Sequence, residues 1–193
     1  MNKAETREKT KRLLWAQPAE ERLRRSREII SKLVKLKEYA DAKTVLAYVS
    51  MDEEVSTREL IPKAISEGKC VVVPAVSHDG KSMTLHEIKS LEELEPGYRG
   101  INEPKDRRTC FECGRLDLAV VPGLAFDKGG NRLGRGKGMF DRLFERAKCP
   151  KVALAFDIQI LDSVPVEKHD SPVDMIVTES RVLRAPKWVA GFR

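Results

Sequence analysis

The sequence predicts an α/β fold with three layers, α/β/α, in which helices cover both faces of a mostly parallel, Rossmann-like sheet. Two observations predict it. Segments rich in valine, leucine and isoleucine alternate along the chain with segments of helical periodicity, and several of the apolar segments are apolar throughout. Continuous apolar strands are typical of parallel sheets, because both of their faces are buried. No linker interrupts the alternation, so residues 1–193 are expected to form a single domain.

Each element is predicted from its own periodicity and punctuation. The first 38 residues contain no glycine and many charges, which indicates helices with solvated faces. Helices are expected at about residues 3–15 and 18–38, at 57–68 with Gly68 as its end, and at 139–148. Strands are expected at 43–50, 69–76, 82–88, 116–126, 151–158 and 173–180, and loops over 90–115. Trp15 and Trp188 are expected to be buried near the chain ends.

Composition and charge limit the classes of function. Charged residues make up 34% of the chain and hydrophobic residues 41%, as in a soluble globular protein. No apolar segment is long enough to span a membrane, and the first residues lack the apolar run of a signal peptide, so we expect a cytoplasmic protein with no membrane partner. The formal net charge of +6 favours a polyanionic partner, such as a nucleotide, a nucleic acid or a polycarboxylate.

The cysteines give a weak signal. There are four, too few and too scattered for a disulfide scaffold. Cys110 and Cys113 form a C-x-x-C pair, but no second pair or nearby histidine accompanies it. Ordinary thiols on a loop are therefore favoured over a metal or redox site.

The stretch GNRLGRGKGMFDRLF, residues 130–144, carries the strongest local signal. Three alternating glycines allow a ligand to approach the main chain, while Arg132, Arg135 and Lys137 supply positive charge. The stretch follows an apolar strand and precedes a helix, where parallel sheets bind ligands and helix N–H groups attract anions. It matches neither the P-loop nor the dinucleotide motif. We interpret it as a phosphate-binding loop, the alternative being a flexible surface loop with incidental charge.

Asp141 follows this loop in the first turn of the expected helix. An acid at that place stabilises the helix dipole. Alternatively it binds Mg²⁺, which takes one or two carboxylates together with phosphate and water oxygens.

The block VVPGLAFDKGGNRLGRGKGMFDR, residues 120–142, closely resembles the signature of the 5-formyltetrahydrofolate cyclo-ligase family, also called methenyltetrahydrofolate synthetases. Four further blocks resemble the family in the family's order: KAETR, SMDEEVST, GINEP and LAFDIQILDSVPVEKHDSPVDMIVTE. The resemblance implies an enzyme that uses ATP and Mg²⁺ to convert 5-formyltetrahydrofolate to 5,10-methenyltetrahydrofolate, with ADP and phosphate released. It implies that the formyl oxygen is phosphorylated and that N10 then attacks the activated carbon.

The resemblance also assigns roles to residues. The implied ATP-binding residues are Lys3, Ala4, Glu5, Thr6, Arg7, Arg132, Leu133, Gly134, Arg135, Gly136, Lys137, Gly138, Met139 and Phe140. The implied substrate-binding residues are Arg7, Met51, Glu54, Ser56, Arg135, Gly136, Lys137, Gly138 and Met139. Arg135 and Lys137 are expected to act in catalysis, and Asp141 and Asp170 to hold Mg²⁺. The family often has an acid at the position of Ser56, for which Glu53 or Glu54 can substitute, and an aromatic residue at that of Met139.

Two other classes of function stay open. A relative that kept only the binding site would act as a nucleotide-binding, folate-binding or regulatory module, but such a protein has little need of both Asp141 and Asp170. A basic nucleic-acid-binding protein would bind in a strongly salt-dependent way, yet aromatic residues are only 6% of this chain and do not interleave with basic ones. We therefore favour a monomeric enzyme with small-molecule substrates and no nucleic-acid partner.

Overall fold

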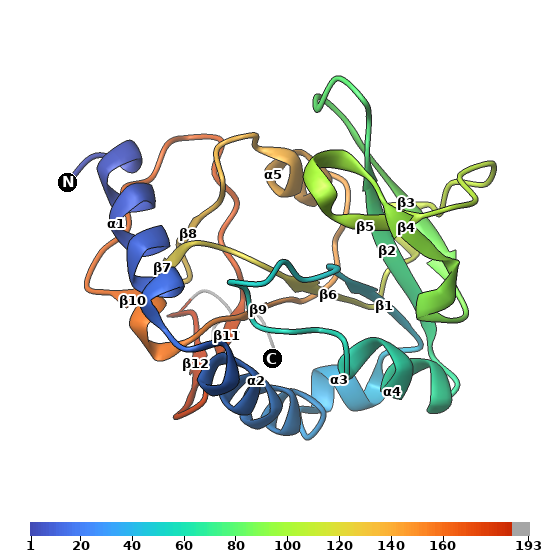
Figure 1. Cartoon of the computed structure of the whole chain (residues 1–193), viewed down its shortest axis with the longest axis horizontal. Helices are drawn as coiled ribbons and strands as arrows, with labels where there is room; N and C mark the ends of the chain where they lie inside the picture. Colours follow the sequence, from blue (N-terminus) through green and yellow to red (C-terminus); the bar gives the residue numbers. More distant parts are fainter. Residues whose placement is uncertain (187–193) are drawn as a thin grey trace.

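The computed structural model describes residues 1–186 (Figure 1). The helices are α1 (Lys3–Ala16), α2 (Ala19–Leu33), α3 (Lys37–Asp41), α4 (Leu60–Ser66) and α5 (Met139–Phe144). The strands are β1 (Thr44–Ala47), β2 (Cys70–Val76), β3 (Met83–Ile88), β4 (Leu94–Pro96), β5 (Asn102–Pro104), β6 (Leu118–Val121), β7 (Ala125–Asp127), β8 (Arg132–Leu133), β9 (Lys151–Leu154), β10 (Ile160–Leu161), β11 (Met175–Val177) and β12 (Val182–Arg184). Within this range no helix combines the length and apolar character that crossing a bilayer requires.

A large, mostly parallel sheet forms the centre of the molecule, as predicted. Its order is β12-β11-β9-β6-β1-β2-β3, and the five strands from β11 to β2 run parallel. The edge strands β3 and β12 pair antiparallel with their neighbours. All four residues of β6 are buried, because this strand has neighbours on both sides and is covered on both faces.

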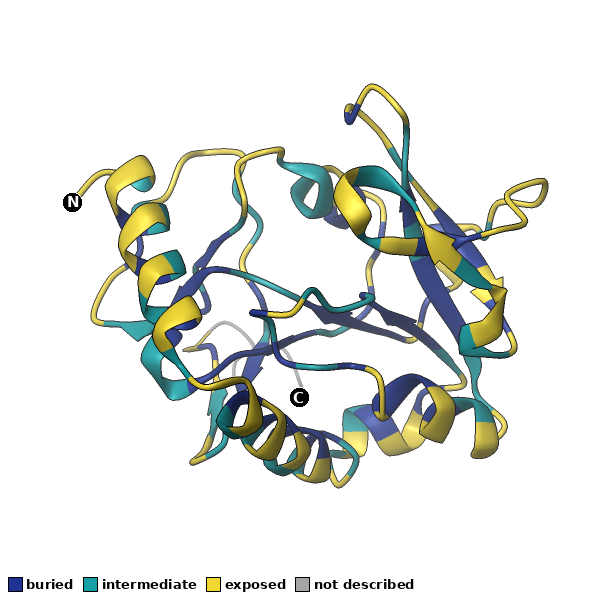
Figure 2. Ribbon diagram, viewed as in Figure 1, coloured by how far each residue is buried: buried dark blue, intermediate teal, exposed yellow. Residues whose placement is uncertain are grey.

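Helices cover both faces of the sheet, which confirms the three layers. Alternate residues of a strand point to opposite faces of the sheet. Val45 packs in the cluster that includes residues of α2, α3 and α4, whereas Leu46 packs in the cluster that includes Leu143 and Phe144 of α5. Figure 2 shows the buried strands between helices whose outer faces are exposed. The second face is covered more thinly, since α5 is a short helix.

The strand expected at 116–126 is interrupted, and this interruption shapes the site. β6 ends at Val121, and the chain resumes as β7 in a separate three-stranded sheet of order β10-β7-β8. Pro122 directly follows β6 and has no N–H to donate to a ladder, which favours the end of the strand at this position. The prediction of a single strand was therefore wrong.

Three other boundaries differ from the sequence-based expectations. The helix expected to run to residue 38 ends at Leu33, and α3 follows as a separate helix whose Tyr39 is buried. Its hydroxyl donates to Glu67, so packing against α4 sets the break. α5 ends at Phe144, before the expected end at residue 148. Further along, Pro150 disfavours helix in the residue that precedes it. After β11 the chain turns and adds β12, a strand that the sequence analysis missed.

Two smaller expectations also change. Trp15 is 57% exposed, so the prediction of burial was wrong. The buried residues of α1 are Thr6, Thr10 and Leu14, and Trp15 lies off that face with the Arg22 guanidinium 5.9 Å from its ring centroid. Trp188 lies outside the described residues. The loop region 90–115 contains the ribbon of β4 and β5, joined by the 3-10 turn Tyr98–Gly100.

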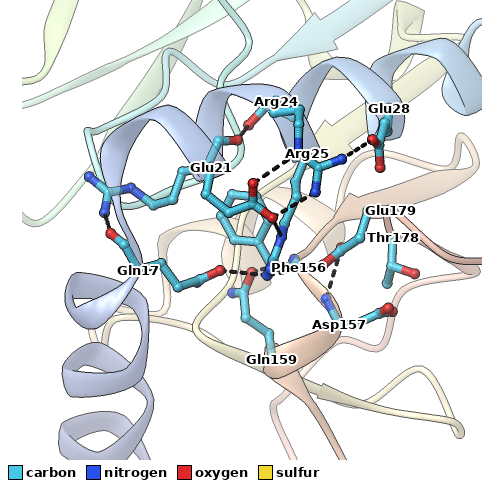
Figure 3. Close-up of polar contacts among 12 residues, drawn as sticks. Gln17, Glu21, Arg24, Arg25, Glu28, Phe156, Asp157, Gln159, Thr178 and Glu179 are labelled. Atoms are coloured by element: carbon cyan, nitrogen blue, oxygen red, sulfur yellow. Dashed lines mark hydrogen bonds and ion pairs between the residues drawn. The ribbon is translucent and has the colours of Figure 1, made fainter.

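A polar network joins α2 to the turn that follows β9 (Figure 3). Arg25 of α2 donates to Glu21 and to Gln17 and lies 3.6 Å from Glu179. Glu179 accepts from the backbone N–H of Asp157. In the same turn the side chain of Gln159, which is 3% exposed, donates to the backbone carbonyl of Gly123 at 2.7 Å. The network connects α2 with the floor of the cavity described next.

Candidate functional site

A cavity of about 920 Å³ lies at the carboxyl ends of β1, β2 and β6. Its walls come from segments that are distant in sequence: α1, the residues after β1, the turn Tyr98–Gly100, the glycine stretch, and residues 165–170. Ligands of parallel sheets bind at this edge, and a volume of this order suits a large ligand or two ligands side by side.

Most residues singled out by sequence line this cavity. They are Lys3, Ala4, Arg7, Met51, Glu54, Arg132, Leu133, Gly134, Arg135, Gly136, Lys137, Gly138, Met139, Phe140, Asp141 and Asp170. Three others lie outside its lining, and their binding roles stay predictions. Glu5 and Asn2 form the capping box of α1, and the hydroxyl of Thr6 donates to the carbonyl of Asn2. The backbone N–H of Ser56 donates to Ser26 of α2.

The first helix is fastened to the other walls by two of its basic residues, Lys3 and Arg7. The ammonium group of Lys3 lies 2.7 Å from Asp170 Oδ2 and 3.1 Å from Glu167 Oε2. Burial opposes its charge, but these hydrogen bonds outweigh burial and raise the pKa of Lys3. Arg7 Nε donates to the carbonyl of Gly134 at 3.0 Å. α1 is thereby held against the glycine stretch.

The glycine stretch takes a conformation that needs glycine at two positions. Gly136 has φ 100° and Gly138 has φ 61°, both in the left-handed region that side chains disfavour. Gly138 is also the residue from which α5 starts. The stretch is therefore a shaped loop on the cavity wall, as expected of a ligand-binding loop.

Arg132 is the most deeply buried of the basic side chains that line the cavity. It is 5% exposed, and its Nη2 donates to Asp141 Oδ1 at 2.7 Å. Its guanidinium also lies 5.7 and 5.8 Å from the ring centroids of Phe140 and Phe144. Burial lowers the pKa of Arg132, although Asp141 opposes the shift. Nε of this guanidinium is buried without a hydrogen-bond partner among residues 1–186, so the site retains an unused donor.

The two basic residues expected in catalysis differ in their surroundings. Arg135 reaches across the cavity, where its Nη2 lies 2.8 Å from Glu53 Oε1 and 2.9 Å from Glu54 Oε1. Burial raises the pKa of Glu54, and the charge of Arg135 opposes that shift. Lys137 has no ion-pair partner among the described residues, so its charge is available for a ligand.

The two carboxylates expected to hold Mg²⁺ lie at one end of the cavity. Asp141 Oδ1 accepts from Arg132 and from the backbone N–H of Ser171, the neighbour of Asp170. Within residues 1–186, Oδ2 of Asp141 accepts no hydrogen bond, and Asp170 Oδ1 has only His169 Nε2 near it, at 3.9 Å. Each carboxylate therefore keeps one oxygen for a cation, and oxygens are the ligands that Mg²⁺ prefers. The donor set fits this ion.

One wall of the cavity was largely missed by the sequence analysis, which singled out only the GINEP block, residues 100–104, of it. Residues Pro74, Val76, Met83, Tyr98, Arg99, Ile101 and Glu103 come from β2, β3 and the β4–β5 ribbon. Glu103, 1% exposed, holds this wall together because it accepts from the backbone N–H groups of Val76 and Tyr98 and pairs with Arg107. The signal was an aromatic and a basic residue between two glycines, GYRG, in a region read only as loop.

The remaining candidates lie apart or at the rim. His169 is exposed and lies 3.2 Å from Glu167 Oε2. Cys110 is exposed and Cys113 is buried, and both are free thiols. Among the described residues, one group of three or more His, Cys, Asp or Glu side chains is close enough to share a metal ion. It consists of Glu167, His169 and Asp170.

Comparisons with known proteins agree on one family. The model of the 5-formyltetrahydrofolate cyclo-ligase family matches residues 1–179. A Mus musculus protein named 5-formyltetrahydrofolate cyclo-ligase is 36% identical over 181 residues, covering 88% of this chain and 89% of its own. The NMR structure of Aquifex aeolicus 5,10-methenyltetrahydrofolate synthetase matches with a TM-score of 0.85 and 35% identity, over 96% of this chain and 94% of that one. A Mycoplasma pneumoniae 5,10-methenyltetrahydrofolate synthetase shares the fold, with a TM-score of 0.75 and 22% identity over 93% of this chain and 99% of that one.

Proposed function

Because this chain belongs to the 5-formyltetrahydrofolate cyclo-ligase family, and is therefore a ligase, we propose that it converts 5-formyltetrahydrofolate to 5,10-methenyltetrahydrofolate with ATP and Mg²⁺. The formyl oxygen takes the γ-phosphoryl group of ATP, and ADP leaves. N10 then attacks the activated formyl carbon and loses its proton, the ring closes, and the former formyl oxygen departs with phosphate.

The observation that supports this proposal most is the convergence of α1, the glycine stretch and the two carboxylates on one cavity. A phosphoryl transfer needs little covalent help from the protein; it needs two ligands in register and compensation of negative charge. Lys137 and the exposed backbone of Gly136 and Gly138 would bind phosphate oxygens. As the phosphoryl group transfers, the Arg135 guanidinium would leave Glu54 and bind the phosphoryl oxygens, because it can pair with either anion.

Asp141 and Asp170 would hold the metal ion. When bound there, Mg²⁺ would neutralise charge on the phosphate oxygens of ATP. Lys3 and Arg132, which now pair with these two carboxylates, keep them oriented toward the cavity and would share them with the ion. Both carboxylates must be ionised for this role. The contacts of Lys3 favour that form at Asp170, where burial is outweighed and the pKa is lowered.

The reduced folate would lie against the wall formed by β2, β3 and the β4–β5 ribbon. Val76, Met83 and Ile101 give this wall an apolar surface for the flat pterin and aminobenzoyl rings. Met51 and Glu54 lie on the neighbouring wall. The family often has an acid at the position of Ser56. In this chain Glu54, two residues earlier, would supply a carboxylate nearby.

A turnover assay tests the proposal. The purified protein is mixed with 5-formyltetrahydrofolate, ATP and Mg²⁺, and the near-ultraviolet absorbance of the methenyl product is followed. We expect a rise that needs both ATP and Mg²⁺. If no product forms while ATP or the folate still binds by calorimetry, the reaction is refuted and the chain is a binding module with the family's fold.

A further inference from the structure

Arg99 carries a positive charge on the cavity wall that no acid among residues 1–186 neutralises. Five basic side chains besides it line the cavity within the described residues, apart from His169. Three of them, Lys3, Arg132 and Arg135, pair with carboxylates. Arg7 and Lys137 belong to the α1 and glycine-stretch walls, and both are available to the phosphates of ATP. Arg99 belongs to neither wall, since it comes from the turn between β4 and β5.

The two arginines in the loop after the ribbon form ion pairs with acids, whereas Arg99 does not. Arg107 pairs with Glu103 at 2.7 Å, and Arg108 pairs with Asp106 at 2.7 Å. For Arg99 the contact that the structure provides is with the ring of Tyr98, whose centroid lies 5.5 Å from its guanidinium carbon. A cation above an aromatic face keeps its charge available to an anion.

The backbone of Arg99 is held in an unfavourable conformation. Among residues 1–186 it is the one non-glycine residue with positive φ, at φ 54° and ψ 29°. Such conformations persist where the surroundings impose them, and they gather at ligand-binding sites. Here the surroundings are tight, because a Cβ at Gly80 of the β2–β3 hairpin would lie only 2.4 Å from the hydroxyl of Tyr98. The packing of Tyr98 therefore holds the turn from which the Arg99 side chain starts.

We propose that Arg99 binds the carboxylates of the glutamate part of the folate. This inference rests on the proposed function. The two substrates carry negative charge at different places: ATP on its phosphates, and the folate on the glutamate beyond its pterin and aminobenzoyl rings. In Figure 1 the β4–β5 ribbon lies on the far side of α5 from α1. With the phosphates at α1 and the glycine stretch, and the rings along Val76, Met83 and Ile101, the glutamate reaches the ribbon. Arg99 is exposed, so further glutamate residues would extend into solvent.

The test compares two substrates that differ only in the glutamate. KM is measured for 5-formyltetrahydrofolate and for its pteroate analogue, which ends at the aminobenzoate carboxylate, with the wild-type chain and three variants. Arg99→Gly removes the guanidinium and suits the positive φ, so it keeps the fold. Arg99→Lys keeps a charge. Arg108→Gly is the matched control, since Arg108 lies in the loop that follows the ribbon, pairs with Asp106 and does not line the cavity.

We expect the wild-type chain to favour the glutamate-bearing substrate by about tenfold in KM, as for one partly exposed, charge-assisted contact. Arg99→Gly should bring the ratio of the two KM values near one, Arg99→Lys should keep most of it, and Arg108→Gly should leave it as in the wild type. KM for ATP should not change with the ratio of the two folate KM values from one variant to the next. A ratio that Arg99→Gly leaves at its wild-type value would overturn the proposal.

An equal rise of both KM values in Arg99→Gly would also overturn it, because the side chain would then act on the ring system. Calorimetric binding of the same two ligands gives the comparison without turnover. Thus a chain that binds both ligands but forms no methenyl product would refute the proposed reaction, while the effect of Arg99→Gly on the two dissociation constants would still decide the role of Arg99.

Discussion

Lys137 is the basic residue of the glycine stretch without an ion-pair partner in the described structure, and its replacement should affect chemistry more than folding. We expect Lys137→Ala to lower kcat/KM about 10²-fold and to weaken ATP binding, as when one preorganised donor to a developing charge is removed. Lys128→Ala is the control, because Lys128 is exposed in the turn before the stretch and does not line the cavity. Steady-state kinetics and ATP calorimetry check the result; unchanged kinetics would exclude Lys137 from catalysis.

One carboxylate oxygen of Asp141 is available to a cation, and Asp141→Asn removes the negative charge of this carboxylate. We expect the Mg²⁺ concentration for half-maximal turnover to rise about tenfold or more. Asp106→Asn serves as the control, since Asp106 pairs with Arg108 away from the cavity. Because the variant also weakens the contact with the buried Arg132, its melting curve is recorded alongside. An Mg²⁺ dependence equal to that of the wild type would refute the assignment.

At the scale of single residues, sequence was informative where a residue type has a narrow range of uses. The glycines of 134–138 and the cations between them predicted a loop that approaches a ligand, and the structure places them on the cavity wall. Glu5 and Thr6 stand beside cavity residues in the chain but serve the start of α1. A helix turns by about 100° per residue, so neighbours in sequence face different ways.

The β7–β8 hairpin is the element that carries the glycine stretch, and Gly130 holds it against the chain before β11. Gly130 has φ 83°, and a Cβ there would lie 2.3 Å from the carbonyl oxygen of Val173. We expect Gly130→Ala to lower the free energy of unfolding by about 2 kcal/mol or more, through backbone strain and steric overlap together. Gly114→Ala should change it by less than about 0.5 kcal/mol, since Gly114 has open space around it. Urea unfolding of both variants measures the difference; equal stabilities would contradict it.

The edge strand β12 is joined to α3 by an ion pair that depends on pH. Arg184 Nη1 lies 2.7 Å from Glu38 Oε1. Burial opposes the charge of Glu38, but Arg184 outweighs it, so the pKa of Glu38 is lowered. A carboxyl group with a lowered pKa adds stability above its unfolded pKa, about 4.3, and loses it as the pH falls through the folded value.

Glu38→Gln should therefore cost about 0.5–1 kcal/mol at pH 7, a figure reduced for the partial exposure of Arg184, and less at pH 3. Urea unfolding at the two pH values gives the comparison. Asp41→Asn is the control, as its pair with Lys37 is exposed. A loss that is the same at both pH values would show that shape, and not charge, is what Glu38 contributes.

At the scale of elements, the apolar strands of the central sheet were predictable because burial on both faces leaves little room for polar residues. Boundaries were less so. The break after Leu33 has no glycine or proline to announce it, and the burial of Tyr39 against α4 decides it. β12 was missed because it is a short, half-exposed edge strand. Such a strand has neither a continuous apolar run nor a clear alternation.

At the scale of the whole molecule, we propose that the chain is one domain and unfolds as one unit. The central sheet takes strands from nearly the whole described length, and the side-chain cluster on one face runs from Leu14 to Val177. Differential scanning calorimetry should give one transition whose calorimetric and van't Hoff enthalpies agree. Two transitions, or a van't Hoff enthalpy well below the calorimetric one, would show separate domains. Light scattering should give the mass of one chain, as expected of a monomer.

The cavity as a whole could be predicted only in part. Family resemblance identified the proposed phosphate side, because that side consists of contiguous motifs. The proposed folate side depends on the β4–β5 ribbon, whose position follows from one buried carboxylate, Glu103, and its contacts with Val76, Tyr98 and Arg107. Contacts of this kind join distant residues, and no local pattern in a single sequence reports them.

The contact between Lys3 and Asp170 has a consequence for how the protein is made. The two residues are 167 positions apart, and their side chains meet at 2.7 Å. Asp170 emerges from the ribosome long after Lys3, once β1, β2, β6 and β9 have been synthesised. The central strands can therefore pair while α1 still lacks its partner. A nascent chain can therefore form the β2-β1-β6-β9 part of its sheet first, and the cavity is completed only once Asp170 has been synthesised.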